Sequence, residues 1–156
     1  MKDYIGIDLG GTYIKYGIVN EVGCIVKKGK TQTPVGCGYD ETVAAISAAV
    51  KKLRSEAEIG GVGIGVPGVI DSSQGIAVTS GNLGWENKPL ASDLSAVLGR
   101  PVVLANDANA AAYGEYMCGS GKEFSSVVLI TLGTGVGSGI IADGNLFEGY
   151  AGAGAE

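Results

Sequence analysis

Two glycine-rich segments, each lying between two strand-like runs, constrain this chain more than any other feature. Residues 8–15 read DLGGTYIK, and residues 131–140 read TLGTGVGSGI. If these glycines opened a helix, helical periodicity would follow them, but both segments continue with the alternation of a strand. The sequence therefore predicts two β-hairpins whose tips expose backbone N–H groups with few side chains to cover them.

The composition is that of a globular chain with an unusual number of glycines. Glycine accounts for 28 of the 156 residues, well above the usual ~7%. The glycines cluster between apolar runs, as turn residues and close-approach residues do. The chain is 46% hydrophobic and 17% charged, so it can bury a core. Its net charge of −5 argues against a nucleic-acid partner held through phosphates.

Residue types also exclude some chemistry. There is no histidine, which removes histidine-based nucleophilic triads and the commonest transition-metal ligand. The cysteines stand far apart, at positions 24, 37 and 118, and predict reduced thiols in a cytoplasmic protein without a zinc site. Residues 124–142 carry no charge, but their alternating glycines indicate strands, so no membrane span is predicted.

Apolar periodicity and turn residues predict the order of strands and helices. Asp40 is expected to cap the first helix and Gly99 to end the second, while residues 71–85 are expected to be loop-rich. The expected strands are 4–9, 13–20, 23–31, 61–66, 102–105, 126–131, 135–142 and 145–147, and the expected helices are 40–58, 89–98 and 107–117.

The end of the chain repeats the pattern of its beginning. Both contain a strand, a glycine-rich turn with a threonine, a second strand, a tight turn and a third strand. This echo predicts a first lobe over 1–120 and a second lobe that opens over 121–156, with a hinge at 119–121. Because a few short strands without a covering helix are marginal alone, the tail is expected to need further chain, the first lobe or another copy.

The first hairpin carries residues suited to a phosphate group. A two-residue turn at 10–11 would put Asp8 and Lys15 on one face, on a diagonal. The bare tip and the Thr12 hydroxyl can cradle phosphate oxygens. Asp8 can hold Mg²⁺ through waters, and Lys15 can neutralise charge. The alternative is an ordinary hairpin with a surface ion pair.

In the second hairpin, four glycines can fall on one face, which leaves two interpretations. The face can let another element pack closely, or it can give a polyphosphate access to Thr134 and to backbone amides. Two such hairpins in one chain favour a phosphate held between two lobes. The glycines are Gly133, Gly135, Gly137 and Gly139.

Polar residues near two turns could contact a second ligand. Asn106 or Asp107 caps the alanine-rich helix, where the helix dipole favours an anion. An ionised aspartate in a cleft can accept a hydroxyl proton as the oxygen attacks phosphorus, and Asn106 could hydrogen-bond a neutral polyol. Plain N-capping is the alternative. Asn82 could contact substrate hydroxyls, whereas Trp85 is expected in the core and 63–71 as a structural turn.

Together these segments resemble the ROK family of sugar kinases, within the actin/hexokinase-like (ribonuclease H-like) fold, and are similar to its bacterial glucokinases. The resemblance implies an α/β lobe with a mixed sheet and flanking helices, followed by the first strands of a second lobe. It rests on DLGGTYIK at 8–15, GVGIGVPGVID at 61–71, GNLGWENKPL at 81–90, ANDANAAAYGE at 105–115, TLGTGVGSGI at 131–140 and EGYAGAGAE at 148–156.

The resemblance also implies roles for individual residues. Asp107 matches the general base that takes the proton of the sugar hydroxyl, and Asp8 matches the Mg²⁺ side of ATP. The positions implied to bind ATP phosphates are Asp8, Gly10, Gly11, Thr12 and Lys15, then Gly133, Thr134, Gly135 and Gly137. Those implied to contact the sugar are Asn82, Asn106, Asp107 and Glu156.

The sequence departs from the family pattern at both ends. The family continues beyond Glu156 with a histidine, a cysteine-rich zinc site and the rest of the lobe that binds adenosine. The chain is therefore expected to be a fragment with little activity alone. The repressor branch carries a helix-turn-helix arm before the first motif, and only seven residues precede Asp8 here, which favours the kinase branch.

The resulting prediction is ATP-dependent, Mg²⁺-assisted phosphorylation of a hexose hydroxyl in the cytoplasm, without a nucleic-acid or membrane partner. Two alternatives stay open: a non-catalytic sugar-binding regulator of the same family, and an ATPase of the same superfamily without a sugar substrate. Glucose is favoured by similarity, but N-acetylmannosamine, fructose, mannose and allose stay open. Unpaired strands in the tail are compatible with a homo-oligomer.

Overall fold

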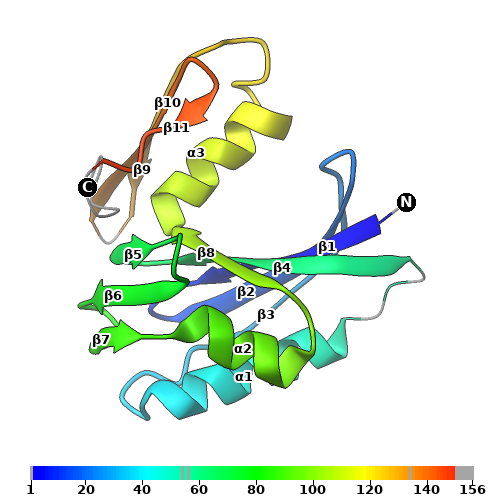
Figure 1. Cartoon of the computed structure of the whole chain (residues 1–156), viewed down its shortest axis with the longest axis vertical. Helices are drawn as coiled ribbons and strands as arrows, with labels where there is room; N and C mark the ends of the chain where they lie inside the picture. The colour runs from blue at the N-terminus through cyan, green and yellow to red at the C-terminus, as the bar shows by residue number, and fades with distance from the viewer. Residues whose placement is uncertain (1, 54, 56, 134, 150–156) are drawn as a thin grey trace.

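The computed structural model describes residues 2–53, 55, 57–133 and 135–149, which form strands and helices over most of the chain. Figure 1 shows their arrangement. The strands are β1 (Lys2–Leu9), β2 (Tyr13–Asn20), β3 (Ile25–Gln32), β4 (Glu58–Val66), β5 (Val69–Asp71), β6 (Ile76–Ser80), β7 (Trp85–Lys88), β8 (Val102–Asn106), β9 (Val127–Leu132), β10 (Val136–Ala142) and β11 (Asn145–Leu146). The helices are α1 (Tyr39–Lys52), α2 (Leu90–Leu98) and α3 (Asp107–Cys118).

The main sheet is mixed, in the order β3-β2-β1-β4-β8. Strands β1, β2 and β3 form an antiparallel meander, while β4 and β8 run parallel to β1. Parallel neighbours need crossover connections, and the segments that contain α1 and α2 supply them. Figure 1 shows α1 and α2 on one face of this sheet and α3 on the other. The predicted α/β lobe with a mixed sheet and flanking helices is confirmed.

The core lies between the main sheet and the two helices α1 and α2. Along β1 the side chains of Ile5, Ile7 and Leu9 are buried at every second position, which is the period of a strand with one covered face. Each fully buried leucine or isoleucine stabilises the fold by roughly 1.5–3 kcal/mol. This packing fixes the position of the β1–β2 turn relative to the rest of the lobe.

Residues 71–85, expected to be loop-rich, instead contribute to a three-stranded antiparallel sheet in the order β5-β6-β7. The strands are short and separated by turn residues, so no long alternation marks them in the sequence. Their inward side chains Ile70, Ala77 and Trp85 join the main core. The Trp85 ring stands edge-on to Tyr39 at 5.1 Å, which confirms its expected place in the core.

Helix α1 is shorter than predicted, and it is capped differently. It ends at Lys52 rather than at residue 58, because Glu58 and Ile59 pair with β1 as the start of β4. Its N-cap is Gly38, without a side-chain cap bond, and Asp40 lies in the first turn. Helix α2 follows the prediction, with Gly99 in the left-handed conformation at its C-cap (φ 63°).

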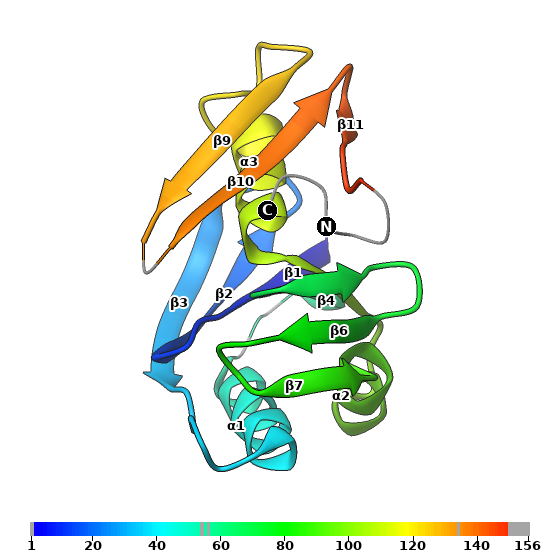
Figure 2. The ribbon, with the colours of Figure 1, turned by 90° about the vertical axis from the view of Figure 1, so that its left-hand side faces the viewer.

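Helix α3 lies between the main sheet and the antiparallel sheet β11-β10-β9, which crosses it in Figure 2. A Cβ placed on Gly139 of β10 would lie 2.5 Å from the Cβ of Ala112 and 2.8 Å from the carbonyl oxygen of Ala108. Glycine is therefore required for this approach of helix and strand. Helix α3 thus covers one face of the last sheet. This agrees with one of the three expectations for the tail, namely that it packs against the first lobe.

The opposite face of the last sheet is apolar and exposed. It carries Val128, Ile130, Leu132 and Val136, each more than 60% exposed.

Among the described residues, no helix is long and apolar enough to cross a membrane. The division into lobes at 1–120 and 121–156 stays a prediction.

Candidate active-site cleft

A cleft of about 630 Å³ opens where the two glycine-tipped hairpins meet the start of α3. Its walls come from segments far apart in the sequence: the β1–β2 hairpin, the turn after β4, the β6–β7 turn, the start of α3 and the β9–β10 hairpin. The predicted site residues that line it are Gly10, Gly11, Lys15, Asn82, Asp107, Gly133, Gly135 and Gly137. The two hairpins therefore face one shared space, together with Asp107.

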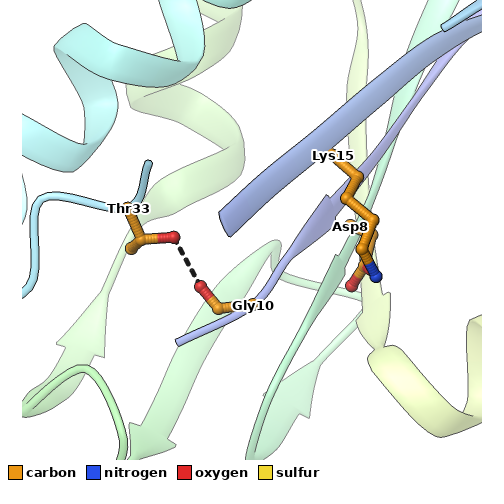
Figure 3. Close-up of polar contacts among 4 residues, drawn as sticks. All are labelled: Asp8, Gly10, Lys15 and Thr33. Carbon is orange, nitrogen blue, oxygen red and sulfur yellow. Dashed lines mark hydrogen bonds and ion pairs between the residues drawn. The ribbon is translucent and has the colours of Figure 1, made fainter. Parts of the chain in front are cut away.

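Asp8 and Lys15 face each other across the β1–β2 hairpin. The Lys15 Nζ lies 2.9 Å from a carboxylate oxygen of Asp8, and the two side chains are 67% and 50% exposed. Figure 3 shows the pair beside the hairpin. The pairing is direct, so the predicted diagonal is wrong, because residues 11–12 rather than 10–11 form the turn. Lys15 lines the cleft, whereas Asp8 lines an adjoining groove that also contains Lys15.

The hairpin tip is held in place by the segment after β3. The Thr33 hydroxyl donates to the carbonyl of Gly10 at 2.6 Å (Figure 3), and the Thr33 N–H donates to the carbonyl of Thr12 at 3.0 Å. The Gly10 N–H closes the turn on the carbonyl of Tyr13 at 3.1 Å. A Cβ on Gly11 would meet nothing within 4 Å, so a ligand can approach its backbone. The Thr12 side chain is exposed but does not line the cleft.

The chemistry of Asp8 fits one kind of Mg²⁺ contact. In the described part of the chain, no three carboxylate, histidine or cysteine side chains converge as a metal cage. Mg²⁺ commonly keeps several waters and is bound through one or two carboxylates plus substrate phosphates. A single half-exposed carboxylate in a groove that adjoins the cleft suits that arrangement.

The glycines of the second hairpin divide into two pairs, one with an open backbone and one packed against α3. A Cβ on Gly133 or Gly135 would meet nothing within 4 Å, so their backbone is open to the cleft. A Cβ on Gly137 would lie 3.3 Å from the Cβ of Ala108, and Gly139 packs against α3 as described above. Close packing therefore explains Gly137 and Gly139. Thr134 lies outside the described residues.

The β8–α3 junction buries Asn106 and presents Asp107 to the cleft. The Oδ1 of Asn106 accepts the N–H of Asn109 at 3.0 Å, and its Nδ2 donates to the carbonyl of Gly68 at 3.1 Å. Asn106 is therefore the N-cap, as the capping alternative proposed. Asp107 is exposed at the first helical position, where its Oδ1 accepts the N–H of Ala108 at 2.9 Å. The positive end of the helix dipole favours an anion at this place.

The β6–β7 turn places Asn82 in the cleft wall. The N–H of Leu83 donates to the carbonyl of Ser80 at 3.1 Å, and Gly84 adopts a left-handed φ of 66°. Asn82 is exposed, as a ligand contact requires. Glu156, the remaining predicted sugar contact, lies outside the described residues.

Sequence reasoning did not assign Pro67, Gly68 or Ser80 to the cleft that they line. Gly68 has a φ of 103°, and a Cβ there would lie 2.2 Å from the carbonyl oxygen of Thr79. The Pro-Gly pair predicts a forced turn from the sequence, but the sequence does not show that this turn lies beside the cleft. Ser80 carries no signal except its position just before Gly81 and Asn82.

The fold defines an actin/hexokinase-like protein with a cleft between two β-hairpins and a helix start. The chain belongs to the ROK family, which matches residues 4–156. It is 43% identical to the glucokinase of Streptomyces coelicolor over 97% of this chain and 47% of that protein.

The relatives that this chain matches include both kinases and a repressor. A ROK family glucokinase from Streptomyces griseus, solved in complex with glucose and AMPPNP, superposes with a TM-score of 0.92 at 41% identity, covering 99% of this chain and 49% of that one. The xylose repressor of Caldicellulosiruptor bescii is 35% identical over 95% of this chain and 38% of the repressor. The chain spans about half the length of the curated glucokinases that it matches.

Proposed function

We propose that this chain supplies the sugar-binding part and both phosphate-binding hairpins of an ATP-dependent hexose kinase. The observation that carries the proposal is the single cleft that both glycine-tipped hairpins share with Asp107. The similarity to glucokinases, one of them solved with glucose and AMPPNP, supports the same conclusion. Glucose is the favoured substrate.

The two hairpins would bind the polyphosphate of ATP. Gly11, Gly133 and Gly135 leave their backbones open, so their N–H groups can approach phosphate oxygens closely. Lys15 would lie against the negative charge of the phosphates, and Asp8 would hold Mg²⁺ through water. Bound Mg²⁺ would neutralise the charge that develops during phosphoryl transfer. Thr12 and Thr134 stay predicted contacts of the same phosphates.

Asp107 would act as the general base. Its carboxylate is exposed at the cleft while a backbone N–H holds one of its oxygens, so the group is oriented before substrate binds. It would accept the proton of the sugar hydroxyl as that oxygen attacks the γ-phosphorus. Asn82, Asn106 and Glu156 stay the predicted sugar contacts, and Asn106 would combine this role with its N-cap bond.

The remaining expectations concern the whole protein. Because the relatives are about twice as long, we expect the 156 residues alone to transfer little phosphate. The predicted division into lobes at residue 120 would let closure exclude water from the reaction. The exposed cysteines Cys24, Cys37 and Cys118 suit a reducing, cytoplasmic environment, and a homo-oligomer stays a prediction.

The test is a coupled ADP assay on the full-length protein with a panel of hexoses, ATP and Mg²⁺. We expect sugar-dependent ADP release that is fastest with glucose. Release that does not depend on sugar would favour the ATPase alternative.

The second candidate is a non-catalytic sugar-binding regulator, favoured by the similarity to the xylose repressor. Sugar binding measured by calorimetry, without any sugar phosphate formed, would identify it. The exposed carboxylate of Asp107 and the open glycines of both hairpins argue for catalysis instead.

A further inference from the structure

The exposed apolar face of the β9–β10 hairpin is not covered by any described part of the chain. Val128, Ile130 and Leu132 alternate along β9, and Val136 of β10 pairs directly with Leu132. Their exposed fractions lie between 63% and 83%. Helix α3 packs on the other side of the hairpin, where Gly139 lies against it. We call these four apolar side chains the open face.

The open face suits an apolar partner. Across the hairpin, Ser138 pairs with Ile130 and Ile140 pairs with Val128, so this side of both strands carries no charge. A contiguous exposed apolar patch of this kind marks an interaction surface in a soluble protein. Leu132 also lines the cleft, whereas Val128 and Ile130 do not, so a ligand in the cleft cannot account for the whole face.

The β1–β2 hairpin shows what covers the matching face elsewhere in the molecule. Leu9 directly precedes Gly10 as Leu132 directly precedes Gly133, and the apolar alternation before each leucine is the same. Leu9 pairs with its partner on β2 as Leu132 pairs with its partner on β10. The side chains of the first hairpin that match the open face are at most 5% exposed; they are Ile5, Ile7, Leu9 and Ile14.

Helices of the same chain bury that matching face. Ile46 and Val50, four residues apart on α1, belong to one core cluster with Leu9 and Ile14. This spacing is that of a helix with one apolar stripe. Helix α1 comes after the β1–β2–β3 meander in the chain, and the relatives that this chain matches extend for about as many residues again. A full-length protein of that length has enough chain for an equivalent helix.

We propose that the open face is an interface within the full-length protein, covered by an amphipathic helix from the half that follows residue 156. The β9–β10 hairpin would then be held between this helix and α3. Its tip, with Gly133 and Gly135 open to the cleft, would be fixed from both sides. The inference goes beyond the proposed kinase function and does not depend on the reaction that the protein catalyses.

The experiment measures thiol labelling in the full-length protein after Cys24, Cys37 and Cys118 are replaced by serine. It compares Ile130→Cys with Val22→Cys, a matched control at an apolar residue that is 74% exposed in the β2–β3 turn. We expect the Ile130→Cys thiol to react at least about tenfold more slowly, because it becomes accessible only when the covering helix opens. The rates should not depend on protein concentration.

A second pair of variants tests the same face by stability. Ile130→Asp should lower the melting temperature of the full-length protein by at least about 5 °C, because the carboxylate would be buried in an apolar interface. Val22→Asp should change it by no more than about 1 °C, because that side chain stays in water. If Ile130→Asp does not fold, the labelling rates still decide.

Two results would overturn the inference. Equal labelling rates for Ile130→Cys and Val22→Cys would show that the face is open to solvent. Protection that is lost on dilution, together with dissociation of a dimer in sedimentation, would show that a second copy covers it. A protein that labels as expected but transfers no phosphate would support the interface and contradict the kinase proposal.

Discussion

Lys15 and Asp8 lie directly opposite each other on β2 and β1, with 2.9 Å between ammonium and carboxylate. Both side chains are at least half exposed, so the pair adds little to stability. Its position matters more, because Lys15 lines the cleft and Asp8 lies beside it. A bound phosphate would compete with Asp8 for the ammonium, while Mg²⁺ would compete for the carboxylate.

Replacing Lys15 with alanine should therefore separate function from stability. In Lys15→Ala of the full-length protein, we expect the free energy of unfolding to change by less than about 1 kcal/mol. The KM for ATP should rise by at least about tenfold, because a charge-assisted contact to phosphate is lost. The control is Lys2→Ala, which removes the exposed Lys2–Glu58 pair (4.0 Å) outside the cleft. If the KM for ATP changed equally in the two variants, Lys15 would not be a contact of the ATP phosphates.

Asp107→Asn tests the general base with little change in shape. The asparagine oxygen can still accept the N–H of Ala108, so the helix start should be kept. We expect kcat to fall by about 10²- to 10⁴-fold, while the KM for the hexose changes little. Steady-state kinetics with glucose measure both. The matched control is Asp143→Asn in the β10–β11 turn, where φ is 47° and asparagine is well tolerated. Near-normal turnover in Asp107→Asn would exclude Asp107 as the base.

Two glycine-to-alanine variants should behave in opposite ways. Gly139→Ala would bring a methyl group to 2.5 Å from the Cβ of Ala112, so we expect a loss of about 1–3 kcal/mol in the free energy of unfolding. Gly133→Ala meets nothing within 4 Å, so stability should be kept while ATP binds more weakly. Urea unfolding and nucleotide titration distinguish the two. A stable Gly139→Ala variant would show that α3 can move away from β10.

Tyr39 joins α1 to α2 and gives a pH-dependent prediction. Its hydroxyl donates to Asp93 at 2.7 Å. Burial, followed by the hydrogen bond and the charge of Asp93, raises the pKa of Tyr39 above its usual value. An unfolded tyrosine loses its proton near pH ~10, while the folded one keeps it. The stabilisation is therefore complete below that pH and is lost as pH rises toward the folded pKa.

Tyr39→Phe should lower the free energy of unfolding by about 1 kcal/mol at pH 8, since the ring is kept and one buried hydrogen bond is lost. The difference from the wild type should shrink above pH ~10. Urea unfolding between pH 8 and 11 measures this. Tyr113→Phe, on the exposed side of α3, serves as the control and should show no such trend. A difference that grows with pH would contradict the assignment.

Local patterns were enough to predict most elements and the two hairpins. The strand at 13–20 and the glycine-ended helix before Gly99 follow from periodicity and turn chemistry, which act over a few residues. The short strands β5–β7 and the early end of α1 were missed. The end of α1 depends on a distant strand, because Glu58 pairs with β1. Strands β5–β7 pair only with one another and are too short to show a long alternation.

The candidate site, too, has features that the sequence predicts and features that only tertiary packing decides. The two glycine hairpins and the helix start at 106–107 could be found from residue types alone. Tertiary packing decided which glycines open into the cleft and which make room for α3. It also decided that Asn106 is the buried cap while Asp107 lines the cleft. Turn and strand preferences depend on residues that are neighbours in the chain. The space beside a Cβ depends on helices and strands that are distant in sequence and pack against it.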